Sequence, residues 1–198
     1  MPDKYANFPE LKKSEPQSYR IRSTPAKSVT VIIAPHGGGT EPGTSEIAEA
    51  IAGKDYSFYA FEGIKNDGNR SLHITSTHFD EPTCLALISK ADRVVAIHGE
   101  EEEEGEAIYL GGRDEACINR MRETLVRHGF RVEKRVKPGL EGIEPMNICN
   151  RNKVGAGAQI ELTNGYRRSF FRSLSRAGRN EPQPRFYEFV NAIREALQ

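Results

Sequence analysis

The chain has 198 residues, enough for one domain to bury a sizeable hydrophobic core without disulfide or metal staples. Its 28 lysines and arginines balance its 28 aspartates and glutamates, so net charge provides no long-range attraction to nucleic acid or an anionic membrane. No run approaches the roughly 18 apolar residues of a membrane span, and the first residues lack the apolar core of a signal peptide. We therefore expect a cytoplasmic protein with no nucleic-acid or membrane partner.

Strand-like and helix-like segments alternate along the chain, and this order predicts an α/β fold. Residues 1–27 are polar and contain proline, which predicts an extended arm or irregular cap, followed by a single α/β domain over residues 28–198. We expect a mixed, mostly parallel sheet with helices on both faces. β-branched and aromatic runs predict strands at 28–36, 56–63, 72–75, 93–99, the end of 101–112, 130–136 and 155–165. Capped amphipathic segments predict helices at 44–53, 81–91, 113–129 and 184–198.

Cysteine is not expected to bind metal here, because the three thiols show no C-x-x-C spacing and are typical of reduced side chains: Cys84, Cys117 and Cys149. The remaining nitrogen ligands are five histidines: His36, His73, His78, His98 and His128. His128 ends a predicted helix before a glycine, which favours a role as a partner of the helix dipole.

Two of the predicted strands end in histidine, at His36 and His98, and Glu161 lies near the end of a third. Ligand sites in open α/β sheets gather beyond the carboxyl ends of the strands, so these side chains are expected to converge. Two neutral imidazoles, one carboxylate and an open position form a typical catalytic zinc set. A histidine at a strand end can equally be a hydrogen-bonded turn residue, but the second strand-then-His-Gly arrangement at His98 favours a site.

Three glycines, Gly37 to Gly39, separate His36 from Glu41. Glycine costs backbone entropy, so a glycine triplet is disfavoured unless the backbone needs unusual angles or space. We expect the loop to fold back toward His36 without side chains that block the metal or the substrate. Glu46 is a rival carboxylate, but it falls inside a predicted helix, where a capping role is the alternative.

Four stretches together resemble the poly-γ-glutamate hydrolase family of Bacillus phages and prophages: "APHGGGTEPGTSEIA", "LHITSTHFDEP", "VVAIHG" and "QIELTNGYRRSF". The resemblance runs from about Val29 to Phe171. It implies a fold like that of carboxypeptidase A, with a mixed sheet between helices, and a single-zinc enzyme that cleaves γ-amide links. Carried over by motif, it makes His36, Glu41 and His98 the zinc ligands and Glu161 the catalytic carboxylate. A phage enzyme without a signal peptide would leave the host by lysis.

A substrate that carries one free carboxylate per residue needs arginine or neutral donors in the site. The pair Asn69 and Arg70 resembles the carboxylate-holding pair of carboxypeptidase-like enzymes. The further candidates for substrate binding are His78, Arg113 and Arg151, and His73 is a possible hydrogen-bond donor. For each of these residues a structural role is the alternative.

Two charged stretches stay open to more than one interpretation. The acidic run Glu100–Glu106 is either a solvated loop or a gate that repels a polyanion or attracts metal ions. The basic stretch after Glu161 could offset that charge: Arg167, Arg168, Arg172, Arg176 and Arg179. Besides the γ-glutamyl hydrolase, which we expect to be a monomer, two alternatives remain. One is a zinc deacylase acting on a small N-acyl amino acid, and the other is a phage protein associated with nucleic acid.

Overall fold

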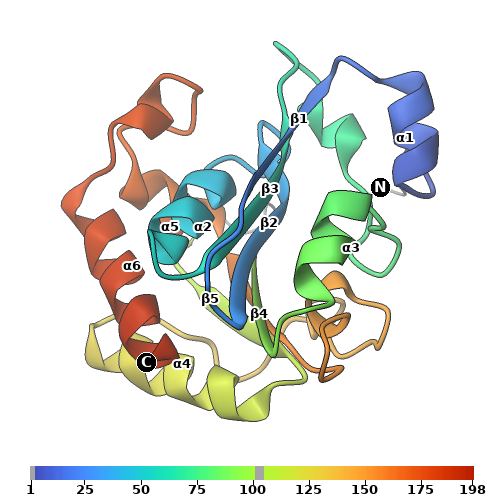
Figure 1. Cartoon of the computed structure of the whole chain (residues 1–198). Helices are drawn as coiled ribbons and strands as arrows, with labels where there is room; N and C mark the ends of the chain where they lie inside the picture. The colour runs from blue at the N-terminus through green and yellow to red at the C-terminus, as the bar shows by residue number, and fades with distance from the viewer. Residues whose placement is uncertain (1–2, 101–104) are drawn as a thin grey trace.

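The computed structural model describes residues 3–100 and 105–198, and its centre is a six-stranded mixed sheet between two layers of helices (Figure 1). The strands lie in the order β1-β3-β2-β4-β6-β5. The four inner strands run parallel, and the two edge strands run antiparallel to their neighbours, which confirms a mixed and mostly parallel sheet. The strands are β1 Tyr19–Thr24, β2 Thr30–Gly38, β3 Ser57–Gly63, β4 Arg93–Gly99, β5 Ile108–Gly112 and β6 Ala158–Leu162.

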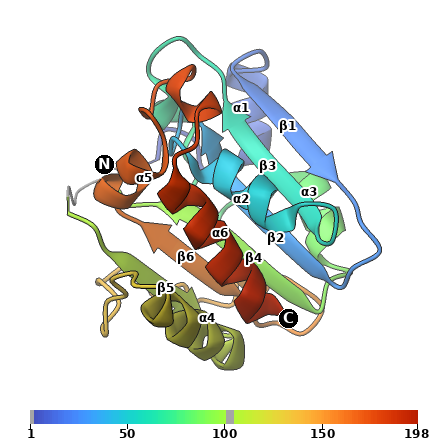
Figure 2. The same cartoon turned by 90° about the vertical axis from the view of Figure 1, so that its left-hand side faces the viewer.

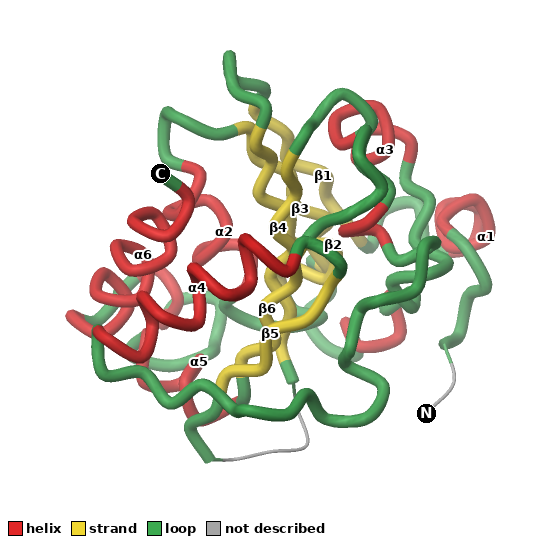
Figure 3. Tube along the Cα trace, turned by 90° about the horizontal axis from the view of Figure 1, so that it is seen from below, coloured by secondary structure: helices red, strands yellow, loops and turns green. Residues whose placement is uncertain are grey.

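Helices cover both faces of the sheet, because the inner strands present apolar side chains to both sides. In β2, Ile32 and Ala34 face one core, whereas Val31 and Ile33 face the other, as the two-residue period of a strand requires. Four helices cover the first face: α2 Thr44–Ala52, α4 Glu115–Arg127, α5 Asn164–Phe170 and α6 Pro184–Leu197. The second face is covered by α1 Phe8–Ser14 and α3 Pro82–Ile88 (Figures 2 and 3). Single turns of 3-10 helix lie at Asn69–Leu72, Ile148–Asn150 and Gly178–Asn180.

The prediction of an irregular polar arm over residues 1–27 is wrong for most of that segment. Phe8 and Leu11 of α1 are buried in the second core, with Leu11 fully inaccessible. Tyr19 begins strand β1, which pairs antiparallel with β3 from Tyr19↔Gly63 onward. The segment forms a helix because two of its apolar side chains are buried against the sheet, and it forms a strand because β3 offers an edge with which to pair. Its polar composition indicated neither element.

Two short predicted strands also do not form. Leu72 ends a 3-10 turn and residues 73–75 follow it outside the sheet, while residues 130–136 contribute only an isolated bridge between Ile108 and Val132. Phe130 is buried among the helices and against Tyr166, so its apolar side chain serves the helical layer. A few residues with high β propensity do not determine whether a segment joins the sheet or packs in the helical layer.

The parallel strands β2, β4 and β6 have their carboxyl ends at the same edge of the sheet. His98 of β4 lies directly opposite Glu161 of β6 in the register, and His36 lies near the end of β2. His36, His98 and Glu161, which the sequence analysis predicted to converge, therefore lie at the same end of the sheet. Among the described residues, no helix is both long and apolar enough to cross a membrane.

Candidate active site and metal centre

Three buried side chains meet at the carboxyl ends of β2 and β4. One donor atom from each of His36, Glu41 and His98 lies within 4.8 Å of the others. The two Nδ1 atoms of His36 and His98 are 3.2 Å apart, and Glu41 Oε1 is 3.0 Å from His36 Nδ1. Two imidazole nitrogens held by one tetrahedral zinc at about 2.0 Å would lie roughly 3.3 Å apart, so the observed separation fits a shared metal ion.

The orientation of His36 is set by the backbone. Its Nε2–H donates to the carbonyl oxygen of Ile74 at 2.8 Å, which leaves Nδ1 as the lone-pair nitrogen that faces the cluster. His98 is also buried, and its Nδ1 faces the same point, 3.2 Å from His36 Nδ1 and 3.7 Å from Glu41 Oε2. Its other ring nitrogen, Nε2, has no hydrogen-bond partner among the described residues. Both imidazoles therefore suit a metal.

The loop after β2 folds back as expected, since the N–H of Glu41 donates to the carbonyl of His36 at 2.8 Å. Glu41 Oε2 in turn accepts from the N–H of Gly99 at 2.8 Å, which ties the loop to the end of β4. The structure shows what each glycine packs against. A Cβ on Gly38, whose φ is +66°, would lie 2.5 Å from the carbonyl of Gly63 in β3. A Cβ on Gly37 would meet Ser45 Oγ and one on Gly39 would meet the side chain of Asn69, so the glycines let these neighbours approach the loop.

Burial and mutual charge place His36 and Glu41 in the protonation states that a metal requires, whereas His98 must lose a proton to bind one. Burial, reinforced by the neighbouring His73, lowers the pKa of His36 to about 4, so its ring is neutral. Burial raises the pKa of Glu41, but its interactions with the imidazoles of His36 and His98 outweigh burial and hold it well below its usual range. Burial lowers the pKa of His98, and the carboxylates of Glu161 and Glu41 reverse this and raise it above 6.5.

Glu161 faces the metal cluster from β6 and is 7% exposed. Burial raises its pKa to about 7, with His98 opposing that shift and Glu41 adding to it. Gln159, two residues earlier on the same face of the strand, donates from Nε2 to Glu161 Oε1 at 3.2 Å and orients the carboxyl group. A carboxyl group with a pKa near neutrality can both accept and donate a proton.

The cluster lies in a cavity of about 990 Å³. Of the predicted substrate-binding residues, Arg70 and the possible donor His73 line it. Asn69 instead braces the loop before it, because its side chain both accepts from the N–H of Lys65 and donates to the Lys65 carbonyl at 2.8 Å.

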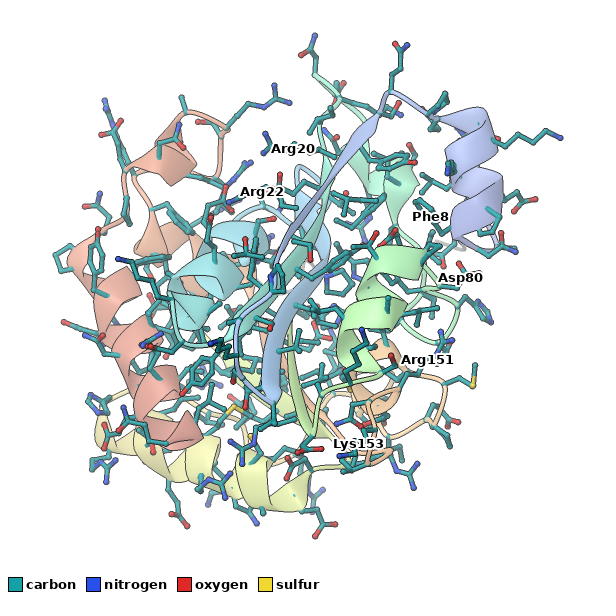
Figure 4. The ribbon with its side chains drawn as sticks, viewed as in Figure 1. Phe8, Arg20, Arg22, Asp80, Arg151 and Lys153 are labelled. Carbon is teal, nitrogen blue, oxygen red and sulfur yellow. The ribbon has the colours of Figure 1, made fainter. Side chains whose placement is uncertain are left out.

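The other three predicted binding residues lie outside the described lining of the cavity. Arg151 donates to the carbonyl of Phe79 on the side of the molecule seen in Figure 4. Arg113 directly follows β5, and its N–H donates to the carbonyl of Gly157, just before β6 begins. It therefore lies near the amino end of β6, whereas Glu161 lies near the carboxyl end of the same strand. His78 is solvent-exposed. Order along the chain does not tell on which side of a sheet a loop emerges.

Several residues that line the cavity had no clear signal in the sequence. Lys137 lies in the irregular segment after α4, and its Nζ is 2.9 Å from Glu100 Oε1 beside the site. Gln159 was within a quoted motif, but only the strand register shows that it shares a face with Glu161. Glu100 begins the predicted acidic gate, whose residues 101–104 lie outside the described part of the chain.

Two arginines of the basic stretch after Glu161 are buried and structural. Arg167 is fully buried and donates to the carbonyls of Leu162, Pro42 and Glu100. Arg179 is also buried and donates to Glu46, the rival carboxylate, at 2.7 Å. Arg172 pairs with Glu181, and Arg176 donates to the carbonyl of Ile64. Arg167 and Arg179 are therefore not available to a partner, whereas Arg168, Arg172 and Arg176 are exposed.

The fold and the donor set together define a class: an α/β protein that can hold a divalent metal beside an acid–base carboxylate. A model of the poly-gamma-glutamate hydrolase family matches residues 5–192, and the chain belongs to that family of hydrolases. UPF0714 protein YndL of Bacillus subtilis (strain 168) is 41% identical over 194 residues, covering 96% of this chain and 76% of that protein. UPF0714 protein YmaC of the same organism is 37% identical over 201 residues, covering 100% and 85%.

Solved structures of relatives share the whole fold. A bacteriophage poly-gamma-glutamate hydrolase is 31% identical and superposes with a TM-score of 0.94, covering 99% of this chain and 97% of that one. YndL, described as apo and zinc-free, is 40% identical with a TM-score of 0.92, covering 99% and 98%. The family resemblance predicted from the four motifs is therefore confirmed.

Proposed function

We propose that this protein is a single-zinc hydrolase that cleaves the γ-glutamyl amide bonds of poly-γ-glutamate. The observation that carries the proposal is the buried cluster of His36, Glu41 and His98 with Glu161 beside it, open to a cavity of about 990 Å³. Membership of the poly-gamma-glutamate hydrolase family and the likeness to a bacteriophage enzyme of that name support the choice of substrate.

The two imidazoles and the Glu41 carboxylate would hold the zinc ion. Mixed nitrogen and oxygen donors with an open position suit catalytic zinc. When bound, zinc would supply a Lewis acid that polarises the amide carbonyl and lowers the pKa of water to about 7. The hydrogen bonds from His36 Nε2 to Ile74 and from Gly99 N to Glu41 keep two of these ligands in place.

Glu161 is the proton carrier in this proposal. Its carboxylate takes a proton from the attacking water and returns it to the nitrogen of the leaving amine. The hydrogen bond from Gln159 leaves the second carboxyl oxygen available for this transfer. Burial, which brings the pKa of Glu161 to about 7, makes both directions of transfer accessible near neutral pH.

The substrate's free carboxylates need cations or N–H groups along the cavity. Arg70 lines the cavity and is the proposed carboxylate partner among the residues that the sequence suggested. Arg167 lies behind the site as a positioning residue, because its guanidinium joins the β2–α2 loop at Pro42 to the end of β4 at Glu100.

The direct test combines metal analysis with a size assay. The purified protein should contain one equivalent of zinc and should shorten poly-γ-glutamate on a sizing gel, with activity lost on chelation and restored by zinc. Poly-α-glutamate is the matched control polymer and should stay intact. Release of glutamate from a small N-acyl glutamate with no shortening of the polymer would instead identify a deacylase. Absence of zinc binding would refute the metal assignment.

A further inference from the structure

A carboxylate from the chain itself lies in the cavity beside the metal cluster. Asp3 lines the cavity, and its Oδ1 is 2.6 Å from His73 Nδ1. Its Oδ2 accepts the backbone N–H of Thr75 at 2.5 Å. Two donors from one short segment, an imidazole N–H and a backbone N–H, thus hold both oxygens of one carboxylate.

The two donors lie next to the proposed metal ligands. The ring centroid of His73 is 4.1 Å from that of His36, and its Nε2 is 3.9 Å from Glu41 Oε1. Its Nδ1 points away from the cluster toward Asp3. The carboxylate therefore sits one imidazole ring away from the site where the amide bond would be cleaved.

The electrostatics favour an ionised carboxylate at this position. Burial raises the pKa of Asp3, but the hydrogen bonds from Thr75 and His73 outweigh burial and lower it. The Asp3 side chain is only 15% exposed. A partly buried position that stabilises the charged form of a carboxylate is a recognition site for carboxylates in general.

We propose that His73 Nδ1 and the Thr75 N–H form a subsite for a pendant carboxylate of the γ-linked glutamate chain, and that Asp3 fills this subsite until substrate displaces it. The inference rests on the proposed function for the identity of the polymer. Each γ-linked residue carries one free carboxylate near its amide bond, so a carboxylate subsite adjacent to the metal cluster fits the spacing of the substrate. His73 is then a specificity-determining residue, and Asp3 is an internal competitor.

The segment that carries Asp3 has a second anchor outside the cavity. The N–H of Phe8, at the start of α1, donates to Asp80 Oδ1 at 2.7 Å (Figure 4). Asp3 can therefore leave the subsite while α1 stays docked. Asp80 offers a control that removes a similar anchor and the same charge, because it lies outside the described cavity lining.

Competition by Asp3 makes a quantitative prediction. If the subsite is free about a tenth of the time, the apparent affinity for an external carboxylate is weakened about tenfold. Asp3→Asn should therefore tighten the binding of a short γ-linked glutamate oligomer about tenfold. The affinity is measured by calorimetry on the zinc-loaded protein carrying Glu161→Gln, which prevents cleavage. In the wild-type background, Asp3→Asn should lower KM and leave kcat unchanged.

A double-mutant cycle isolates the subsite from general charge effects. His73→Phe keeps a ring next to His36 and removes the donor, so Asp3→Asn should no longer tighten binding in that background. Asp80→Asn reports loosening of the segment, and Glu144→Gln removes a charge from a residue that lines the cavity. The proposal is overturned if Asp3→Asn gains no more affinity than Glu144→Gln or Asp80→Asn, or if its gain persists with His73→Phe.

A second probe separates failure of the subsite from failure of the proposed function. Glutarate carries the carboxylate without any amide bond, and its binding to the zinc-loaded protein should also tighten with Asp3→Asn and weaken with His73→Phe. If the polymer is not cleaved but glutarate follows this pattern, the subsite stands and the substrate assignment falls. If the polymer is cleaved and neither probe responds to Asp3→Asn, the function stands and the subsite is wrong.

Discussion

Replacing Glu161 with glutamine separates its catalytic role from its structural role, because the amide has the same size and can still accept the hydrogen bond from Gln159. It cannot take up a proton from water. General acid–base catalysis contributes about 10²–10⁴-fold to rate, so kcat on poly-γ-glutamate should fall by at least that factor. Zinc content and substrate affinity should be retained, because Glu161 is not one of the three proposed ligands.

The same variant should stabilise the metal-free protein at alkaline pH. Burial raises the pKa of Glu161 from 4.5 to about 7, so between these values the folded protein binds more protons than the unfolded chain. The free energy of unfolding therefore decreases as pH rises through this window, and the full penalty is present above pH 7. At 1.36 kcal/mol per pKa unit the penalty is about 3 kcal/mol. Glutamine cannot ionise and removes it.

Thermal unfolding of the metal-free wild type and variant at pH 5 and pH 8 measures this difference. For a chain of this size, about 1 kcal/mol corresponds to 2–4 °C, so the variant should melt roughly 6–12 °C higher at pH 8 and only about 2–3 °C higher at pH 5. Glu81→Gln is the matched control, since Glu81 is buried and caps α3 away from the cavity. That control should keep full turnover and gain no stability at pH 8.

Three results would refute this reasoning. Turnover within a few-fold of wild type would mean that Glu161 does not carry the proton. Loss of zinc from the variant would mean that Glu161 is itself a ligand, and the assignment of the metal cluster would change. A lower melting temperature at pH 8 would show that the Glu161 carboxylate forms stabilising contacts that outweigh its burial.

The remaining predictions concern the metal cluster and its support. Alanine at any one of the three proposed ligands should abolish zinc binding and turnover and leave cooperative unfolding intact: His36→Ala, His98→Ala and Glu41→Ala. Glu46→Ala is the control and should keep one zinc by metal analysis. Loss of zinc from this control variant would refute the ligand set. Zinc affinity, measured against a competing chelator, should fall about tenfold per pH unit below the raised pKa of His98, because a proton must leave the ring before it binds metal; a flat profile between pH 8 and pH 5 would exclude His98. Arg167→Met should lower the free energy of unfolding by about 3–5 kcal/mol in urea titrations, because it leaves several buried carbonyls without donors; a change below 1 kcal/mol would contradict this support role.

The sequence alone predicted the central strands and the cluster at their ends. The run that ends at His36 and the run that ends at His98 are apolar and β-branched, so both are buried strands whatever their neighbours are. Parallel strands bring their carboxyl ends to one edge, and this local rule was sufficient to place Glu161 with the two histidines. The four motifs also identified the family correctly.

The tertiary structure decided what the segments outside the central sheet do. Phe8 and Leu11 look like isolated apolar residues in a polar segment, and only the uncovered face of the sheet gives them a place to be buried. In the sequence Arg167 looks like part of a basic surface, yet it is fully buried, because carbonyls from the end of β6, the β2–α2 loop and the segment after β4 accept from its guanidinium. Neither environment is encoded in the residues next to them.

The difference between the two kinds of result has one physical cause. Strand formation and the convergence of strand ends follow from periodicity and from interactions between residues close in sequence. Asp3 meets His73 and Thr75 across 70 residues or more, and such a contact depends on how loops pack once the sheet exists. The clustering of His36, Glu41 and His98 could therefore be predicted from the sequence, whereas the carboxylate that lies beside them is known only from the fold.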